Sequence, residues 1–181
     1  MQGFDGFKTT ILSAFAIICV VLWSGFAALA DSPFKSDQFG FEVVFPEKPR
    51  AQAGVRNFAS GPAQVIRFKS TGEVIRPALS LIIFERGAFS PEEITAALEL
   101  SSERQVRQFN GSLVSSEDIV VDGYRGKETV LKGSHQGRTF FYRSQTYYAG
   151  NRQFILSVAA EDLNGVGKVA DGYFASFHIT D

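Results

Sequence analysis

The chain has 181 residues, a length typical of one domain. Hydrophobic residues make up 45% and charged residues 20%, so wholesale disorder is not expected. The 18 Lys and Arg nearly balance the 19 Asp and Glu, and a net charge of −1 excludes a global basic field that would hold nucleic acid. One Cys and two His exclude a Cys-rich zinc site and a disulfide framework. The 18 Phe and 17 Gly favour strands and turns.

An uncharged apolar run occupies residues 11–30, near the start of the chain. It ends with Ala28 and Ala30, small residues at the −3 and −1 positions of a cleavage site, and polar residues follow at once. This order is typical of a secretory signal peptide, although the run is also just long enough to be an uncleaved membrane anchor. We therefore expect residues 1–30 to be a signal peptide, with an anchor as the alternative. Residues 31–181 are expected to form one exported domain, periplasmic or extracellular.

The first part of the expected domain is rich in strand patterns. Alternating apolar residues predict a strand over residues 39–45, which a proline ends. Residues 50–62 are rich in Ala and Gly and indicate a loop or an irregular edge segment. A short strand is expected over 63–69, and the doubly apolar run 79–84 predicts a central strand covered on both faces. The expected strand over 63–69 places three residues on one face: Val65, Arg67 and Lys69.

A helix is expected to begin after Ser90. Pro91 suits the first helical position, and Glu93 lies three residues after Ser90, which is the spacing of a capping box. Apolar residues then recur at helical spacing for about 19 residues, until the Asn-Gly pair at 110–111 ends the pattern.

The rest of the chain predicts a meander of hairpins closed by a helix. Four strands are expected, over residues 113–121, 124–131, 138–149 and 153–160. Residues 165–177 repeat apolar side chains at helical spacing, and a short last strand follows at 178–180. The sequence therefore predicts an α+β domain, with an antiparallel, mostly meander sheet of about seven strands and two helices packed on it.

Residue patterns for known catalytic and metal chemistries are not found. The two candidate imidazole bases are His135, in a glycine-flanked turn, and His178, which we expect to be a partly buried end residue. The Cys at position 19 lies in the predicted signal peptide, and no Gly-x-Ser-x-Gly or His-x-x-x-His motif occurs. The acidic loop 161–165 has oxygen donors for a weak calcium ion, but such loops are usually helix caps. We therefore expect no catalytic residue, no cofactor and no metal site.

Arg, Lys and Tyr side chains from the predicted hairpins are the candidate interaction surface. Arg and Tyr are enriched at protein interfaces, and Arg also at anion sites. The alternative is a solvated strand face with snorkelling cations. The candidate residues are Arg125, Lys127, Arg138, Tyr142, Arg143, Tyr147 and Arg152.

Four segments resemble exported bacterial proteins of the PsbP/Mog1-like group. They are FGFEVVFPEKP at 39–49, GYRGKE at 123–128, the hairpin 143–156 and YFASFHI at 173–179. The resemblance covers most of residues 39–180. It implies an α/β/α sandwich around an antiparallel sheet and non-enzymatic binding to a larger partner, as in photosystem accessory proteins and a Ran-binding nuclear factor. No functional residue of those proteins maps onto this chain.

These observations predict an exported, non-catalytic binding or accessory protein of the cell envelope. Its expected partner is an unidentified protein or envelope component, with no nucleic acid, and with membrane contact through residues 11–30 if they remain uncleaved. The alternative is a binding protein for a small ligand (a lipid, sugar or tetrapyrrole) or an enzyme, with a pocket between a helix and the sheet.

Overall fold

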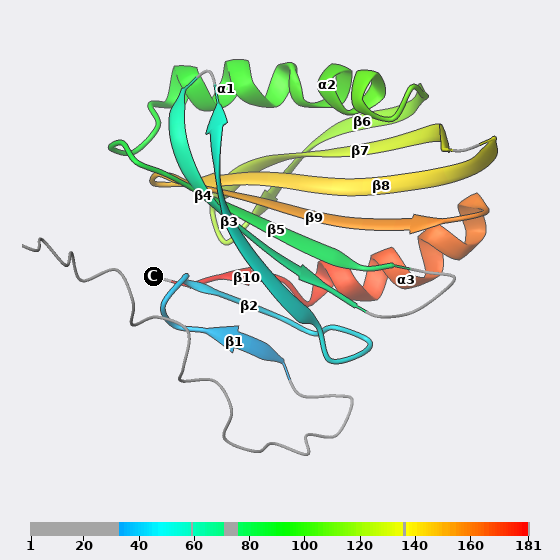
Figure 1. Cartoon of the computed structure of the whole chain (residues 1–181), viewed down its shortest axis with the longest axis horizontal. Helices are drawn as coiled ribbons and strands as arrows, with labels where there is room; N and C mark the ends of the chain where they lie inside the picture. Colours follow the sequence, from blue (N-terminus) through cyan, green and yellow to red (C-terminus); the bar gives the residue numbers. More distant parts are fainter. Residues whose placement is uncertain (1–32, 59, 71–75, 136, 181) are drawn as a thin grey trace, which may run out of the picture.

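The domain is built on a twisted seven-stranded antiparallel sheet with helices on both faces (Figure 1). The computed structural model describes residues 33–58, 60–70, 76–135 and 137–180, so the predicted signal peptide and anchor lie outside the described residues. The predicted α+β class, with two helical layers on a mostly meander sheet, is confirmed. In sheet order the strands are β3 (Arg50–Phe58), β4 (Gly61–Lys69), β5 (Ala78–Phe84), β9 (Arg152–Ala160), β8 (Arg138–Ala149), β7 (Tyr124–His135) and β6 (Ser112–Val121).

A second, three-stranded sheet lies beside the main one. It pairs β1 (Phe34–Ser36) and β10 (His178–Ile179) with the central β2 (Phe41–Val43). The strand expected over 39–45 is therefore shorter, and it belongs to this small sheet rather than to the large one. The reason is that β2 brings Phe41 and Val43, both fully buried, beneath the main sheet, so the small sheet covers its core.

The first helix has the predicted start and a bend that was not predicted. It comprises α1 (Pro91–Glu99) and α2 (Ser101–Gln108), and the capping box of Ser90 and Glu93 is confirmed. At the junction the Ser101 hydroxyl donates to the Leu98 carbonyl at 2.7 Å, a local bond that favours bending of a helix.

The last helix, α3 (Leu163–Ala175), begins two residues before the expected start. Asp162 caps it by accepting from the Gly165 backbone N–H at 2.7 Å, which is the capping role that the acidic loop suggested. No helix within the described ranges is long and apolar enough to cross a membrane.

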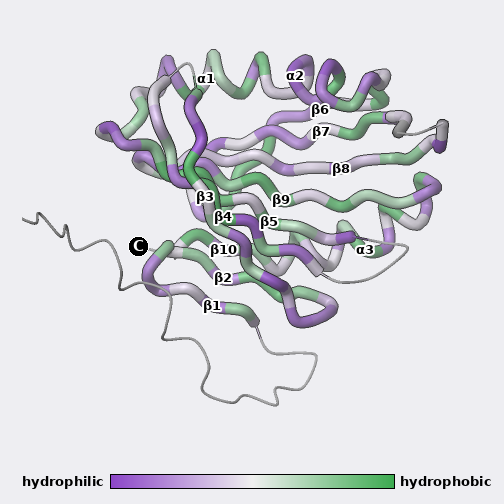
Figure 2. Tube along the Cα trace, in the orientation of Figure 1, coloured by the Kyte–Doolittle hydropathy of each residue, from purple (hydrophilic) through white to green (hydrophobic). Residues whose placement is uncertain are grey.

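The main core lies between the seven-stranded sheet and the layer formed by α3 and the small sheet. Phe154 of β9 contacts Phe41 and Phe177, with ring centroids 6.0 and 5.6 Å apart. On the opposite face a smaller cluster of Ala63, Val65, Ile82 and Phe84 lies towards α1. Hydrophobic stretches gather in inner strands such as β5, whereas the β3–β4 hairpin carries hydrophilic ones (Figure 2).

Residues 50–62 were expected to be a loop or an irregular edge segment, and of these the loop is wrong and the edge position is right, although the segment is a regular strand. Residues 50–58 form the edge strand β3, which pairs with β4 along its full length, from Arg50 opposite Lys69 to Phe58 opposite Gly61. Eight of its nine residues are exposed. Only its last residue, Phe58, packs on the core, against Phe84, so β3 lacks the apolar alternation by which buried strands are recognised. This hairpin carries the site described below.

Candidate functional site

The structure divides the seven predicted interaction residues between the two faces of the sheet. Opposed residues of antiparallel strands share a face, and neighbours along a strand alternate. The face that carries α1 and α2 has four of them: Arg125, Lys127, Arg138 and Tyr142. The opposite face, which carries α3 and the small sheet, has the other three: Arg143, Tyr147 and Arg152. They therefore do not form one surface.

On the α1–α2 face the predicted cations bond to neighbouring elements. Arg125 donates to the Thr95 hydroxyl of α1 at 3.0 Å. The Lys127 ammonium lies 2.9 Å from the Asp118 carboxylate of β6, and this contact lowers the pKa of Asp118. Both contacts connect elements of the fold, whereas Arg138 is exposed at the β7–β8 turn.

On the other face Arg143 is the centre of a half-buried polar network. Its Nε and Nη2 donate to both oxygens of Glu128, at 2.9 and 3.1 Å, and its Nη1 donates to Asp171 of α3 at 2.5 Å. Gln145 also donates to Glu128 at 2.7 Å and accepts from the Tyr147 hydroxyl at 2.7 Å. Burial disfavours the charge of Arg143, but the bonds to its two acids outweigh burial and raise the pKa of its guanidinium. The network joins α3 to the sheet.

Arg152 is also bonded within the fold. Its Nη1 donates to the Phe39 carbonyl at 2.9 Å, and its guanidinium lies over the Phe154 ring. Whether any of the seven residues touches a partner stays a prediction.

The histidines are placed differently from the expectation. His178 is exposed rather than partly buried, and its Nδ1 lies 3.3 Å from the Asp122 carboxylate. The same carboxylate accepts from the Ile179 backbone N–H at 2.9 Å, so Asp122 joins the β6–β7 turn to β10. No described serine hydroxyl bonds to His178. His135 ends β7, and the described side chains do not include its own. Within the described ranges, no group of three His, Cys or acidic side chains could hold a metal ion.

A set of unpaired cations lies on one face of the β3–β4 hairpin. We call this surface the basic hairpin face, and define it by Arg50, Arg56, Arg67 and Lys69. The register puts all four on the same face of the ribbon, with Arg50 directly opposite Lys69 and Arg67 directly opposite Gln52. Among the described residues none of the four has an ion-pair or hydrogen-bond partner. The rows of β5 and β9 that continue this face contain no acid.

The basic hairpin face costs stability rather than supplying it. Like charges directly opposite each other on neighbouring strands are destabilising, and Arg50 and Lys69 are such a pair. Arg67 is partly buried with no partner among the described residues, although burying a charge is unfavourable unless it is paired. A cluster of this kind on a folded domain is typical of a site that meets an opposite charge from outside.

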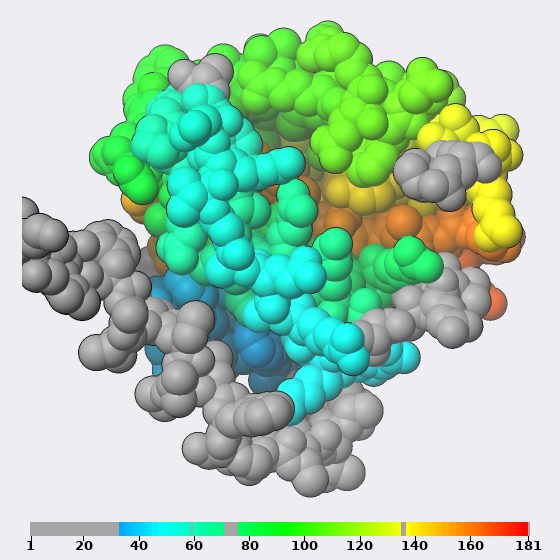
Figure 3. All heavy atoms as spheres, in the orientation of Figure 1, coloured from blue at the N-terminus to red at the C-terminus, as the bar shows by residue number. Residues whose placement is uncertain are grey.

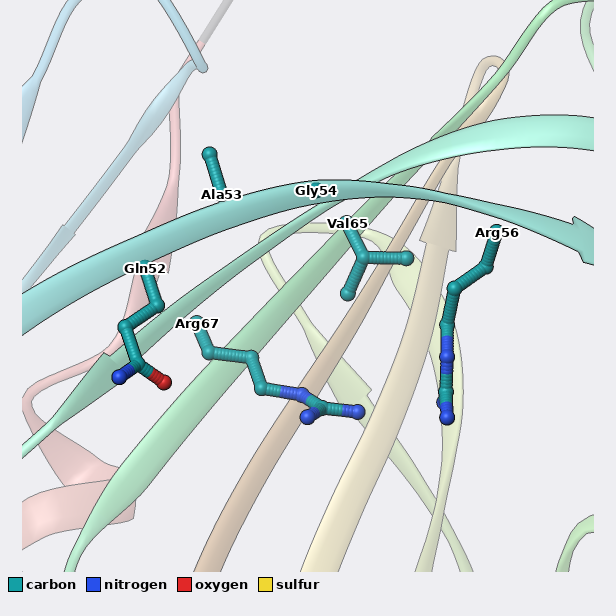
Figure 4. Close-up of a pocket in the computed structure, with 6 residues that line it drawn as sticks. All are labelled: Gln52, Ala53, Gly54, Arg56, Val65 and Arg67. Carbon is teal, nitrogen blue, oxygen red and sulfur yellow. The ribbon is translucent and has the colours of Figure 1, made fainter.

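A shallow hollow of about 200 Å³ lies within this face, lined by Gln52, Ala53, Gly54, Arg56, Val65 and Arg67. Figure 4 shows the side chains of Gln52, Arg56 and Arg67 on the same side of the ribbon, with Val65 between the two arginines and Ala53 turned away. Figure 3 shows the hairpin on the molecular surface, with a recess beside it where atoms of β8 and β9 are visible. The hollow is therefore lined by β3 and β4, not by a helix and the sheet.

The chemistry of the hollow is that of anion binding. Arginine stays charged at all physiological pH values and presents a planar fork that matches a carboxylate or a phosphate. Neither an arginine nor a glutamine can act as a general base near neutral pH, so these side chains hold an anion without reacting with it. A volume of about 200 Å³ is also below the roughly 300–1,000 Å³ of small-molecule sites, so the hollow fits one group rather than a whole lipid or tetrapyrrole.

Sequence reasoning placed two of these four cations correctly but did not recognise any of them as a site. Arg67 and Lys69 were expected on one strand face with Val65, and the structure confirms that placement. Arg50 and Arg56 were missed because their segment was interpreted as a loop. The signal that could have found them is the alternation of Arg50, Gln52 and Arg56 on one face of a strand, ending in a turn before Gly61.

Comparison with known proteins shows the fold. No protein-family model and no curated protein matches the sequence. Cyanobacterial PsbP (CyanoP) from Synechocystis sp. PCC 6803 matches in structure with a TM-score of 0.59 at 10% identity, over 86% of this chain and 96% of that one. A protein of unknown function from Pseudomonas aeruginosa, described as a putative regulator, gives a TM-score of 0.41 at 11% identity, over 66% of this chain and 92% of that one. A Bacteroides thetaiotaomicron protein gives 0.46 at 13% identity, over 84% of this chain and 50% of its own. The chain has the PsbP-like fold.

Proposed function

We propose that this chain is an exported, non-catalytic binding protein that docks on an acidic partner protein of the cell envelope through its basic hairpin face. The observation that carries the proposal is a set of four cations on one face of an edge hairpin, with no partner among the described residues. Export rests on the pattern of residues 1–30. The resemblance to the PsbP/Mog1-like group, which implies non-enzymatic binding, agrees with this function.

The shape and composition of the face favour a protein over a membrane. Peripheral membrane binders combine cations with exposed large apolar side chains that enter the lipid. Between the cations this face carries Gln52, Gly54, Ala63 and Val65, and the two apolar members are buried. The exposed Val55, which lies nearby, is on the opposite face of the ribbon. The arginines also flank a hollow, which suits a projecting side chain better than a flat surface.

The open edge of β3 offers a second means of contact. β3 is the last strand of the sheet and pairs with β4 alone among the described residues, which leaves its outer backbone N–H and C=O groups without a partner strand in that part of the chain. An extended segment could add to such an edge by main-chain hydrogen bonds, with alternate side chains directed to the basic face. An acidic segment would therefore meet the cations along its length.

The test is the affinity of the full chain for a Glu-rich peptide and for its Gln-substituted counterpart, measured by titration calorimetry. Replacing Arg50, Arg56, Arg67 and Lys69 together by Gln should weaken binding of the Glu-rich peptide about tenfold or more. The matched control replaces four exposed cations elsewhere by Gln, with the same change in net charge: Arg104, Arg107, Lys132 and Lys168.

The proposal is wrong if both fourfold variants lose affinity equally, because binding would then follow net charge alone. It is also wrong if the full chain binds vesicles of an anionic phospholipid but not the Glu-rich peptide, since the face would then be a membrane-binding surface.

A further inference from the structure

We infer that the hollow between Arg56 and Arg67 is a binding site for a single carboxylate group, supplied by an acidic side chain or by the free C-terminus of the partner segment. This inference rests on the proposed function, because it names the group by which the partner is anchored. The rest of the basic hairpin face would then attract the partner without binding one group specifically.

The strand register creates the space. Gly54 lies opposite Val65, in the row between the Gln52–Arg67 pair and the Arg56–Ala63 pair. A Cβ atom at Gly54 would meet no atom within 4 Å. Because glycine has no side chain, the space above Gly54 is empty, whereas any other residue would fill it. The two arginines lie on either side of this gap and come from different strands (Figure 4). Gln52 adds an amide on the side of Arg67.

The donors in the hollow favour a carboxylate over a phosphate. Phosphate sites in proteins commonly use backbone N–H groups at a helix N-terminus or in a loop. Here β3 and β4 are paired along their whole length, and no helix contributes to the lining. The hollow therefore offers side-chain donors, and the planar guanidinium fork matches the two oxygens of a carboxylate. Its volume of about 200 Å³ limits the ligand to a small group.

Gly54→Val tests the hollow without changing any charge. Valine suits a strand, and its Cβ atom would meet no atom within 4 Å, so the new side chain would occupy the gap between the arginines. We expect this variant to bind the Glu-rich peptide about tenfold more weakly than the parent chain. The matched control is Ala51→Val, which adds bulk at an exposed position on the opposite face of the same strand, outside the lining of the hollow, and should leave the affinity unchanged.

Arg67→Lys keeps the charge and removes the planar fork. It should weaken peptide binding about tenfold, whereas the matched control Arg107→Lys, at an exposed position of α2 outside the basic hairpin face, should not. Thermal unfolding of all four single variants shows that each is folded at the temperature of the titration.

Three ligands identify the anion. They are a Glu-rich peptide with an amidated C-terminus, a Gln-rich peptide with a free C-terminus, and inorganic phosphate. If Gly54→Val weakens the binding of either peptide, the inference is supported. The peptide that is affected shows whether a side chain or the C-terminus supplies the carboxylate. If phosphate binds more tightly than either peptide and displaces both, the site is a phosphate site and the inference of a carboxylate is wrong.

The outcomes separate the two proposals. If Gly54→Val and Arg67→Lys bind like the parent chain while the fourfold Gln variant of the basic hairpin face does not, the face binds the partner but the hollow is not its carboxylate site. If the parent chain binds neither the Glu-rich peptide nor the Gln-rich peptide with a free C-terminus, the proposed function itself fails.

Discussion

Arg143 and Arg67 are both partly buried arginines on strands of the same sheet, yet their surroundings are opposite. Arg143 bonds to two carboxylates and lies over the Phe174 ring, so its charge is neutralised within the fold. Arg67 faces a hollow with a second arginine beside it and no acid among its described contacts. The first cation therefore stabilises the fold, whereas the second has no internal partner among the described residues, and we propose that it serves binding.

The comparison also explains why composition could not distinguish the two regions. Each is a set of cations on strands, and they differ in whether acids lie within reach across the register. Glu128 lies next to Arg143 because β7 and β8 pair with Val130 opposite Arg143. On the hairpin the residues that pair with Arg67 are Gln52 and Ser80, neither of which can neutralise it.

The largest effect on stability is expected at Arg143, whose charge is paired within the fold. Arg143→Ala should lower the free energy of unfolding by about 2–4 kcal/mol, since it leaves the Glu128 carboxylate largely buried without its partner. Urea denaturation measures this change. Asp171→Asn is the control: Asp171 is 71% exposed, so its loss should cost about 1 kcal/mol or less. If Arg143→Ala lowers the free energy of unfolding no more than Asp171→Asn does, the Arg143 network does not stabilise the fold as we expect.

A smaller effect on stability is expected in alkali, and it should come from two buried tyrosines of β8. Burial, with the charges of Glu128 and Asp122, raises the pKa of Tyr147 above its usual value of 10, and burial raises that of Tyr148 to about 12. The folded chain therefore holds these protons more tightly than the unfolded chain. The resulting stability is complete below pH 10 and is lost as pH rises from about 10 to 12 and beyond.

Urea denaturation at pH 8 and pH 11 measures this loss. Tyr147→Phe and Tyr148→Phe should each lose less stability between the two pH values than the parent chain. The basic hairpin face has no tyrosine, so both variants should bind the Glu-rich peptide at pH 8 as the parent chain does. Equal loss in the parent and in both variants would show that other groups cause the alkaline effect.

The smallest effect on stability is expected at the unpaired cations. Arg50→Gln or Lys69→Gln relieves a like-charge pair, so each should raise the free energy of unfolding by about 0.2–1 kcal/mol in low salt, and by less in high salt. Denaturation at two salt concentrations measures it. A clear loss of stability in either variant would mean that the cation stabilises the fold, as Arg143 does, and the proposed difference between the two regions would be wrong.

Patterns of apolar and turn residues in the sequence predicted most of the fold, because such patterns depend on which side chains are buried. The capping box at Ser90, the doubly apolar run that became β5, and the hairpins from β6 to β9 all have a buried face or a turn residue that fixes them. The edge strand β3 was missed because it is exposed on both sides. Its structure comes from pairing with β4, which no periodicity of its own reveals.

The candidate site was harder to predict because it depends on which side chains lack partners. The sequence alone singled out cations on β7, β8 and β9. Arg125, Arg143 and Arg152 were correctly seen to belong to the hairpins, but each has a bond to another part of the fold. Such bonds join residues up to 113 positions apart, from Phe39 to Arg152, and are visible only in three dimensions.

The most direct test of the account is to follow the arginine side-chain Nε–H signals by NMR while the Glu-rich peptide is added to the full chain. Arg→Lys substitutions at 56, 67 and 143 assign the three signals. We expect the signals of Arg56 and Arg67 to shift with one common saturation curve and the chemical shift of Arg143 to stay unchanged. A shift at Arg143, or small equal shifts at all three, would contradict it.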